Sequence, residues 1–372
     1  MDYVIIGGGV YGCGVAWELA RLGAEVMLLE ATTVAAGASG GGGKRGVRAN
    51  GRDLRELSLM QMAYPLWPHL HEELGHDTGY QRIGHLQLVE RERDLAGLSA
   101  RAWMQNQQGI ETQLLDAAAV RTYEPHVNED VLGALYCPLD GIADHTATTK
   151  GYATAAKRAG AVLREQTPIV KIEESAGRVT AVYTATDERI TVGKALILLA
   201  NSAVPRLLHD TFQLTLPVWS RVPQYLVTTV VDPLPLRHLI GHAHRRLAMK
   251  ALPGGQVMIS GGWLGVWDAE QKQGVTVPDQ VAGNLAEAVA LYPTLADVPV
   301  AYAAADRLET ETADGIPIID RVSGVENLYY GVGWSGHGWA IAPAVVKLMA
   351  AWISTGQPSA QLAPFAYKRF QS

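Results

Sequence analysis

Three glycines near the start of the chain have a spacing that suits phosphate binding. Gly7, Gly9 and Gly12 form a Gly-x-Gly-x-x-Gly motif, and Glu30 closes the next apolar segment. Gly7 permits a tight turn, Gly9 lets backbone N–H groups approach a pyrophosphate, and Gly12 allows close packing of a helix on a strand. Glu30 can accept hydrogen bonds from a ribose, and its charge would repel a 2′-phosphate, which disfavours NADP. These residue types predict a dinucleotide site.

The elements around this motif are those that such a site requires. Residues 3–6 predict a buried strand, the residues after Gly9 predict a helix that ends at Gly23, and residues 25–29 predict a second strand. In this unit the helix N-terminus, with its partial positive charge, points at the phosphates. The complete strand–helix–strand unit is much more specific than a glycine motif alone.

Residues 36–43 favour a flavin over a nicotinamide. They read Ala-Gly-Ala-Ser-Gly-Gly-Gly-Gly, which is too rich in glycine to pack as a strand. An NAD domain would continue here with its next strand–helix unit. We expect this run and residues 44–48 to form a loop that wraps the flavin and its phosphates. A flexible linker is the alternative.

A second glycine-rich segment lies near the C-terminal end. Residues 327–339 read Asn-Leu-Tyr-Tyr-Gly-Val-Gly-Trp-Ser-Gly-His-Gly-Trp and follow an Asp314-Gly315 turn. We expect a strand, a turn and a helix from about Ala342, with Pro343 in the first turn, where its missing N–H costs nothing. A helix N-terminus aimed at a flavin would stabilise the negative charge of its reduced form.

The rest of the chain predicts two interleaved domains. We expect helices at 54–74, 146–159 and 279–291, and strands at 83–89, 131–136, 168–173, 178–184, 190–200, 222–231 and 255–263. The fold class is α/β. An FAD-binding, Rossmann-like domain of the glutathione-reductase type takes residues 1–82, 137–214 and 303–372, and an inserted antiparallel-sheet substrate domain takes residues 83–136 and 215–302.

Composition excludes several classes of protein. The 31 basic and 37 acidic residues give a net charge of −6 without long runs of one sign, which argues against a nucleic-acid partner. No apolar run reaches the roughly 20 residues that span a bilayer, and no basic segment precedes the first strand as in a signal peptide. Cys13 and Cys137 have no metal or redox spacing. We expect both to be buried, in a protein of the reducing cytoplasm or of the inner membrane face.

With its motifs at Gly7–Glu30 and Asp314–Trp339, the chain resembles the family of D-amino acid oxidase, glycine oxidase and sarcosine oxidase. The resemblance covers nearly the whole chain. At residues 46–49 and 83–86 it is most similar to the β subunits of heteromeric sarcosine oxidases, dye-linked L-proline dehydrogenases and opine oxidases. It implies an FAD enzyme that oxidises the C–N bond of a small secondary-amine amino acid. The expected steps are hydride transfer to flavin N5 and hydrolysis of the imine.

The resemblance also implies site residues. Arg48 stands where sarcosine oxidases bind the substrate carboxylate, a role that suits a bidentate guanidinium. His337 is expected to contact flavin or substrate, Tyr225 and Trp263 to line the substrate pocket, and no metal is expected. The residues expected to contact FAD are Gly7, Gly9, Val10, Tyr11, Gly12, Glu30, Ala31, Ser39, Gly40, Gly41, Gly42, Lys44, Val170, Gly333, Gly336, His337, Gly338 and Trp339.

This chain departs from the family pattern in three ways that matter. Glu309 replaces the substrate arginine of glycine and D-amino acid oxidases, which disfavours those substrates. The flavin-linking cysteine of monomeric sarcosine oxidases falls on Arg307, and residues 36–43 contain no histidine, so we expect non-covalent FAD. The lysine that promotes reaction with oxygen falls on Met258, an uncharged thioether, with Lys250 as the alternative if the alignment is shifted. A dehydrogenase is therefore favoured over an oxidase.

The resemblance implies a second, α subunit that carries its own flavin or iron–sulfur centre. Other hypotheses stay open. The chain could be a glycine or D-amino acid oxidase, an electron-transfer flavoprotein subunit without a substrate site, or a nicotinamide-dependent dehydrogenase.

Overall fold

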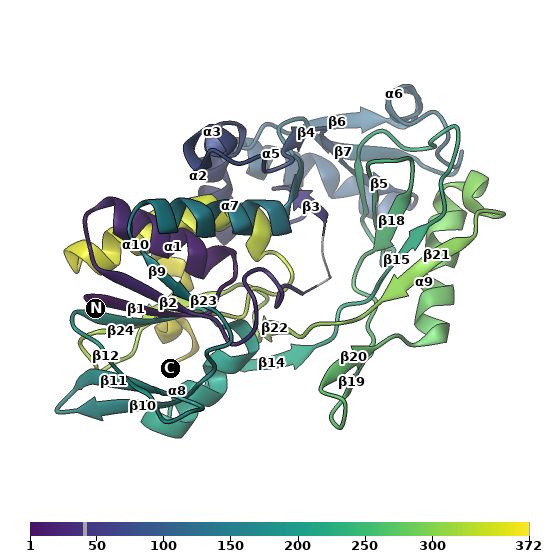
Figure 1. Ribbon diagram of the computed structural model, residues 1–372. Helices are drawn as coiled ribbons and strands as arrows, with labels where there is room; N and C mark the ends of the chain where they lie inside the picture. The colour runs from purple at the N-terminus through teal and green to yellow at the C-terminus, as the bar shows by residue number, and fades with distance from the viewer. Residues whose placement is uncertain (40–42, 372) are drawn as a thin grey trace.

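A six-stranded sheet forms the centre of the first half of the fold in the computed structural model, which describes residues 1–39 and 43–371 (Figure 1). Its order is β23–β24–β13–β1–β2–β9, and every neighbouring pair is parallel except β23–β24. The strands are β1 (Tyr3–Ile6), β2 (Val26–Leu29), β9 (Val162–Arg164), β13 (Ala195–Leu198), β23 (Ile318–Arg321) and β24 (Leu328–Val332).

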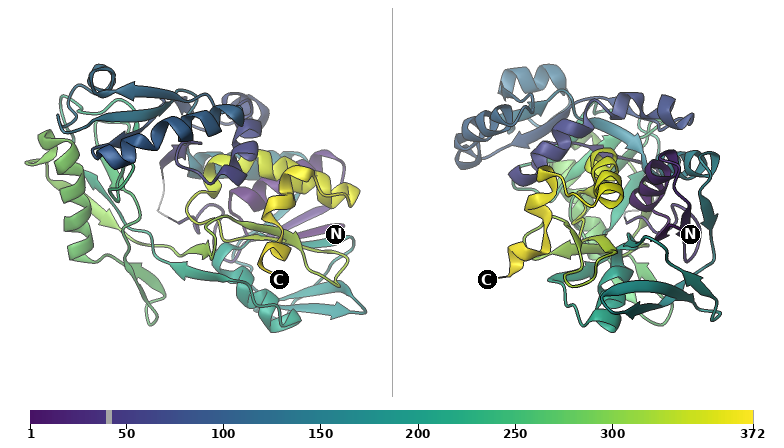
Figure 2. Two further views of the ribbon diagram at one scale, coloured as in Figure 1. Left: turned by 180° about the vertical axis from the view of Figure 1, so that it is seen from behind. Right: turned by 90° about the vertical axis from the view of Figure 1, so that its left-hand side faces the viewer.

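Both faces of this sheet are covered (Figures 1 and 2). One face packs against α1 (Val10–Arg21), α7 (His145–Arg158) and α10 (Gly338–Thr355). The other packs against α8 (Val204–Phe212) and a meander of β10 (Ile169–Ser175), β11 (Arg178–Thr184) and β12 (Arg189–Thr191). Strand β1 divides its side chains between the two cores, because successive strand residues point to opposite faces: Ile5 belongs to the first core and Val4 to the second.

Glycines set how closely α1 approaches its neighbours. A Cβ atom on Gly12 would overlap the carbonyl oxygen of Gly7, and one on Gly14 would lie 2.6 Å from Cγ2 of Val346 in α10. Helix α1 therefore fits between β1 and α10 only because these positions lack side chains.

An eight-stranded sheet, in the order β21–β15–β18–β17–β16–β5–β7–β6, forms the second half. It is antiparallel except for the β5–β16 pair, and α9 (Pro278–Leu291) packs against it through Ala288 and Leu291. Its strands are β5 (His85–Val89), β6 (Gln113–Asp116), β7 (Gly133–Cys137), β15 (Tyr225–Thr228), β16 (Leu239–His242), β17 (Ala248–Ala251), β18 (Val257–Ser260) and β21 (Val300–Ala304).

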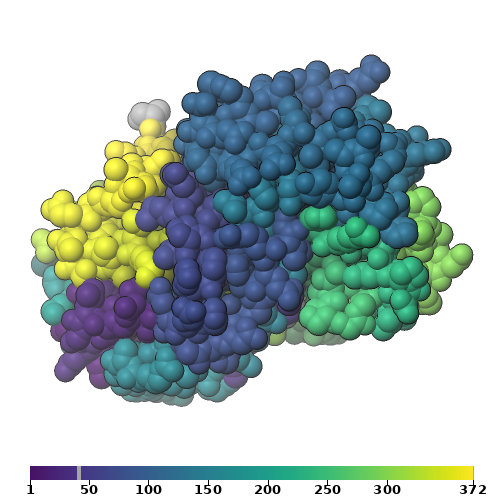
Figure 3. All heavy atoms as spheres, turned by 90° about the horizontal axis from the view of Figure 1, so that it is seen from above, coloured from purple at the N-terminus to yellow at the C-terminus, as the bar shows by residue number. Residues whose placement is uncertain are grey.

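Short elements join the two halves. They are the sheet of β3 (Lys44–Val47), β8 (Gly141–Asp144) and β4 (Gln81–Arg82), and the pair of β14 (Val218–Arg221) with β22 (Glu309–Thr312). Helices α4 (Glu92–Ala96), α5 (Leu98–Gln107) and α6 (Ala117–Tyr123) connect β5, β6 and β7. Seen from above, the blue atoms of this region border both the yellow C-terminal segment and the green segment (Figure 3).

The structure corrects several sequence predictions. Residues 44–47 form strand β3 rather than a loop, because they pair with β8. The helix expected at 54–74 is four short segments, η1 (Leu54–Glu56), α2 (Leu57–Ala63), η2 (Trp67–His69) and α3 (Leu70–Leu74), because Pro65 and Pro68 each lack a backbone donor. The strand expected at 190–200 is two strands, β12 and β13, in different sheets. The last helix begins at Gly338, so Pro343 lies inside it.

Other expectations agree with the structure or stay open. Cys13 and Cys137 are buried free cysteines, as predicted. Helix α10 is long and apolar enough to cross a membrane, but 67% of it is buried inside the protein. The six-stranded sheet takes its strands from residues 3–29, 162–198 and 318–332, and the eight-stranded sheet from residues 85–137 and 225–304. The domain boundaries themselves stay a prediction.

Candidate active site

A cavity of about 970 Å³ lies where the two halves of the fold meet. Its walls come from the residues that follow β1, β2 and β24, from β3 and from strands β5, β15, β16, β17 and β18. Its volume is at the upper end of the range of about 300–1,000 Å³ for ligand pockets. The cavity can therefore hold a large cofactor and a small substrate together.

The first glycine motif forms one end of this cavity. Gly9 is the N-cap residue of α1, which has neither a side-chain cap nor an acidic residue in its first turn. A Cβ atom on Gly9 would meet nothing within 4 Å, so the backbone is open to a ligand. Gly7 has a φ of 114°, in the region that favours glycine. This uncapped helix N-terminus fits a pyrophosphate.

Glu30 is held in place at the end of β2. Its Oε2 accepts the N–H of Gly8 at 2.7 Å, and its Oε1 accepts the N–H and the hydroxyl of Thr32 at 2.8 and 3.0 Å. Glu30 and Ala31 both line the cavity. A carboxylate in this position can accept hydrogen bonds from a ribose, as the sequence predicts.

The second glycine-rich turn meets the first. The ring of Trp334 stacks on that of Tyr11 with centroids 3.7 Å apart, and the Tyr11 hydroxyl donates to the carbonyl of Gly338. His337 is the N-cap residue of α10, and no side chain caps this helix. Gly336, His337, Gly338 and Trp339 line the cavity, together with Val10, Tyr11 and Ser39. The N-termini of α1 and α10 therefore both face it.

Arg48 is a buried cation on the cavity wall. Its NH1 donates to the carbonyl of Asn50, and no carboxylate among the described residues forms an ion pair with it. Burial, and then the charge of Arg52, lower the pKa of Arg48. A buried guanidinium without a counter-ion is costly. This cost favours the binding of an anion at Arg48.

His337 faces the same space as a neutral imidazole. Burial lowers its pKa well below the usual value, and the charges of Arg48, Arg52 and Arg221 lower it further. A neutral histidine can accept or donate a hydrogen bond without placing another positive charge beside Arg48.

Met258 also lines the cavity. Its uncharged side chain led us to expect no basic group at this place, but Lys250 and Arg45 lie beside it. Lys250 of β17 is its direct cross-strand partner, is 5% exposed and lines the cavity. Arg45 donates from NH1 to the Met258 sulfur at 3.3 Å and lies over the Tyr225 ring, 5.5 Å from its centroid. Met258 therefore does not leave this place without basic groups, although burial lowers the pKa of Lys250 well below its usual value.

Tyr225 and Trp263 line the cavity as expected, and the Trp263 Nε1 donates to the carbonyl of Arg246 at 2.7 Å.

Glu309, which is 4% exposed, also lines the cavity. Its Oε2 accepts from the Ser39 hydroxyl, and its Oε1 has no partner among the described residues. Burial is the main cause that raises the pKa of Glu309. An acid in this place does not suit the role of a carboxylate anchor.

Some predicted site residues do not line the cavity. Lys44 donates to Oε1 of Gln81 at 2.7 Å, and Val170 is 51% exposed on β10. Gly12 supports helix packing, and Gly333 donates its N–H to the Thr310 hydroxyl at 2.9 Å. Gly40, Gly41 and Gly42 lie outside the described residues.

Several residues that line the cavity were not predicted from the sequence. From β5 come His85 and Gln87, from the start of β10 and the segment before it come residues 167–169, and from the segment after β13 come residues 200–203. The predicted contact at Val170 was therefore misplaced by one residue, because Ile169 lines the cavity and Val170 does not. His85 had a signal, because it lies in the 83–86 segment that carries the family resemblance.

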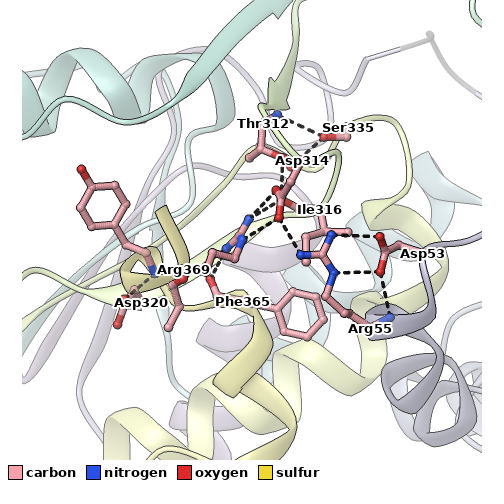
Figure 4. A network of polar contacts seen from close by, with 12 residues as sticks. Asp53, Arg55, Thr312, Asp314, Ile316, Asp320, Ser335, Phe365 and Arg369 are labelled. Atoms are coloured by element: carbon pink, nitrogen blue, oxygen red, sulfur yellow. Dashed lines mark hydrogen bonds and ion pairs between the residues drawn. The ribbon is translucent and has the colours of Figure 1, made fainter. Parts of the chain in front are cut away.

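Asp314, in the C-terminal motif, ties the end of the chain to the first half of the fold (Figure 4). Arg55 donates to it at 2.7 Å, and Arg369 donates to both of its oxygens at 2.9 and 3.0 Å. These residues lie outside the cavity, so the contacts are structural.

Glu90, His242 and His244 lie close enough together to hold a metal ion. However, Nδ1 of His242 accepts the backbone N–H groups of His244 and Arg245 at 3.3 and 3.2 Å, so its Nε2 carries the proton. Both oxygens of Glu90 are bonded to Arg245. The cluster is therefore an ion-pair network rather than a metal site.

Comparison with known proteins identifies the family. Residues 2–352 match the family described as FAD dependent oxidoreductase (DAO). This chain belongs to the FAD dependent oxidoreductase family. It is an oxidoreductase whose cofactor is FAD, and the uncapped helix N-termini and Glu30 fit that cofactor.

Two curated relatives and one solved structure are similar over the whole chain. The beta subunit of sarcosine oxidase from Rhizobium meliloti (strain 1021) is 26% identical over 378 residues, which cover 100% of this chain and 88% of that protein. A subunit of opine oxidase from Agrobacterium tumefaciens (strain Ach5) is 24% identical over 385 residues, which cover 100% and 98%. The structure of L-proline dehydrogenase from P. horikoshii has a TM-score of 0.89 at 22% identity and covers 100% and 97%. That likeness establishes the fold.

We predict that the FAD is not covalently bound. Arg307, at the place of the flavin-linking cysteine, instead donates from Nε to the carbonyl of Ala36 at 2.8 Å. Precipitation of the yellow protein with acid should release all of the flavin into the supernatant. Flavin that stays with the pellet would contradict this prediction.

Proposed function

We propose that this enzyme oxidises the C–N bond of a small secondary-amine amino acid of the sarcosine, proline or opine type. The observation that carries the proposal is Arg48, a buried cation that forms no ion pair with a carboxylate of the described residues and lies in a cavity shared with the cofactor motifs. The names of the two curated relatives and of the solved structure support the substrate class. FAD, when bound, would supply the acceptor for the hydride that leaves the carbon next to nitrogen, and the resulting imine would be hydrolysed by water.

The residues of the chain bind and orient the substrate in this proposal. Arg48 binds the carboxylate through two parallel hydrogen bonds, which fixes the direction in which the amine and its C–H bond point. His337, neutral and close by, does not compete for the carboxylate and can bond the amine. Tyr225 and Trp263 supply aromatic walls to the cavity.

The substrate class can be tested with a single screen. Sarcosine, L-proline, hydroxyproline, glycine and opines are offered with an artificial dye as electron acceptor. Reduction of the dye by secondary amines, and little by glycine, supports the proposal, whereas preference for glycine or a D-amino acid supports the alternative oxidase. If no amino acid reduces the flavin, the electron-transfer hypothesis is the better account.

Replacing Arg48 tests the anchor. Loss of a charge-assisted contact to a buried anion costs about 2–5 kcal/mol, which corresponds to tens to thousands-fold in kcat/KM. Arg48→Ala should show that loss and retain its FAD. Arg55→Ala is the matched control, because Arg55 lies outside the cavity and pairs with Asp53 and Asp314. Wild-type kinetics in Arg48→Ala would refute the assignment.

The reaction with oxygen should depend on Lys250. Met258 alone predicts slow reoxidation, but Lys250 and Arg45 lie beside it. Burial lowers the pKa of Lys250 well below its usual value, and in its protonated form the ammonium would stabilise the anion that forms as oxygen is reduced. Reoxidation of the reduced enzyme, followed by stopped flow, should slow by about tenfold or more in Lys250→Met, or about 1.4 kcal/mol.

Two comparison variants sharpen this test. Met258→Lys should change the rate little, because the Arg45 guanidinium already contacts Met258. Lys272→Met is the control, because it removes a lysine from the turn between β19 (Val266–Asp268) and β20 (Gln273–Val275). Unchanged reoxidation in Lys250→Met would contradict the role of Lys250, and slow reoxidation of the unmodified enzyme that quickens greatly in Met258→Lys would favour the dehydrogenase expectation.

We further propose that the chain works as one component of a hetero-oligomer. The support is that the curated relatives are named as subunits. In addition, the β19–β20 hairpin projects from the fold (Figure 1) and exposes Val266, Trp267 and Val275 by 55%, 41% and 40%. The native enzyme should co-purify with a second polypeptide that carries a redox cofactor. An isolated monomer with full activity toward its physiological acceptor would refute this.

A further inference from the structure

Arg52 connects the two segments that carry the candidate substrate-binding groups. It lies between β3 and η1, and it is 3% exposed. Its Nε donates to the carbonyl of Arg48 at 2.7 Å, its NH2 donates to the carbonyl of His337, and its NH1 donates to Oε1 of Glu56 at 2.9 Å. One side chain thus bonds two backbone positions that are far apart in the sequence.

The geometry of a guanidinium makes this connection rigid. Its donors are fixed in one plane, so the positions of both carbonyl acceptors are set relative to each other. Oε1 of Glu56 accepts a hydrogen bond from the third donor, NH1, and so fixes the orientation of the guanidinium plane. A lysine ammonium in this place would carry the positive charge, but it could not present donors in this rigid, planar arrangement.

The opposite side of Arg48 is held independently. The buried carboxylate of Asp140 accepts the N–H of Ala49 at 2.7 Å, the N–H of Asn50 at 3.2 Å and the hydroxyl of Tyr64 at 2.6 Å. The backbone that follows Arg48 is therefore fixed to Asp140. What these bonds do not fix is the position of residues 48–50 relative to the turn at His337.

Stability alone does not explain the Arg52–Glu56 pair. Their side chains are 2% and 0% exposed, so both charges have lost their hydration. Buried ion pairs are often no more stabilising than well-packed apolar residues of similar size. Arg52 also does not line the cavity, so it does not touch the substrate.

We propose that Arg52 is a positioning residue that sets the place of Arg48 relative to His337. This inference rests on the proposed function, in which Arg48 binds the substrate carboxylate. A displaced anchor holds the carboxylate but misplaces the C–H bond, and a displacement of about 1 Å can cost about 10²-fold in rate.

Two variants test this. Arg52→Lys keeps a cation beside Glu56, and the double variant Arg52→Met with Glu56→Met removes both charges, so that no buried carboxylate is left unpaired. In the FAD-loaded enzyme we expect kcat/KM for the best substrate of the screen to fall by about 10²-fold. We also expect weaker binding of acetate, a non-reacting carboxylate, measured from the change in the flavin absorption spectrum. FAD content should not change.

The control removes a comparable guanidinium outside the cavity. Arg369 donates to Asp314 and to the carbonyl of Ile316 (Figure 4). Arg369→Met should lower the melting temperature and leave kcat/KM and the acetate Kd unchanged. A merely structural Arg52 would behave in the same way, and that result in both Arg52 variants would overturn the inference.

The test also separates this inference from the proposed function. If Arg48→Ala leaves the acetate Kd unchanged, the carboxylate anchor is wrong, and the positioning role of Arg52 is overturned with it. If Arg48→Ala weakens acetate binding but the Arg52 variants behave as wild type, the anchor stands and only the positioning role is wrong.

Discussion

The meeting of two helix N-termini at one edge of the central sheet is the constraint on which the site depends. Strands β1 and β24 are parallel to β13, which lies between them, so their carboxyl ends reach the same edge. Each strand leads through a glycine-rich turn into a helix that has no side-chain cap. The stacking of Tyr11 on Trp334 then fixes one turn against the other. The partial positive charge of both helices is directed into one cavity.

The electrostatics of the cavity follow from this arrangement. Arg48, Arg45 and Lys250 add basic side chains beside the helix ends, and burial makes their charged forms costly and lowers the pKa of each, that of Lys250 well below its usual value. Bound anions offset that cost, namely the cofactor phosphates at α1 and, in our account, a substrate carboxylate at Arg48. His337 stays neutral in this field because an additional charge there would be repelled. The site is therefore selective for anionic ligands before any specific contact is considered.

The sequence predicted the parts of the site that depend on local spacing. Gly7, Gly9 and Glu30 lie in one strand–helix–strand unit, so a short stretch of sequence contains the reasons for their positions. The sequence did not predict contacts that depend on strand register. Lys250 lies beside Met258 only because β17 pairs with β18 in that register. The bonds from Arg52 to Arg48 and His337 depend on how the last helix docks, and that helix begins four residues earlier than the sequence predicts.

The central claim is that the substrate carboxylate, held by Arg48, orients the C–H bond that is oxidised. The most direct measurement compares an amino acid with its methyl ester under anaerobic conditions, and follows the loss of visible flavin absorption after mixing. The two compounds share the amine and the reacting C–H bond; the ester lacks the negative charge that Arg48 would bind and carries one additional methyl group. Our account predicts rapid bleaching by the acid and slow bleaching by the ester, with no difference between them in Arg48→Ala. Equal bleaching rates for acid and ester in the wild-type enzyme would contradict it.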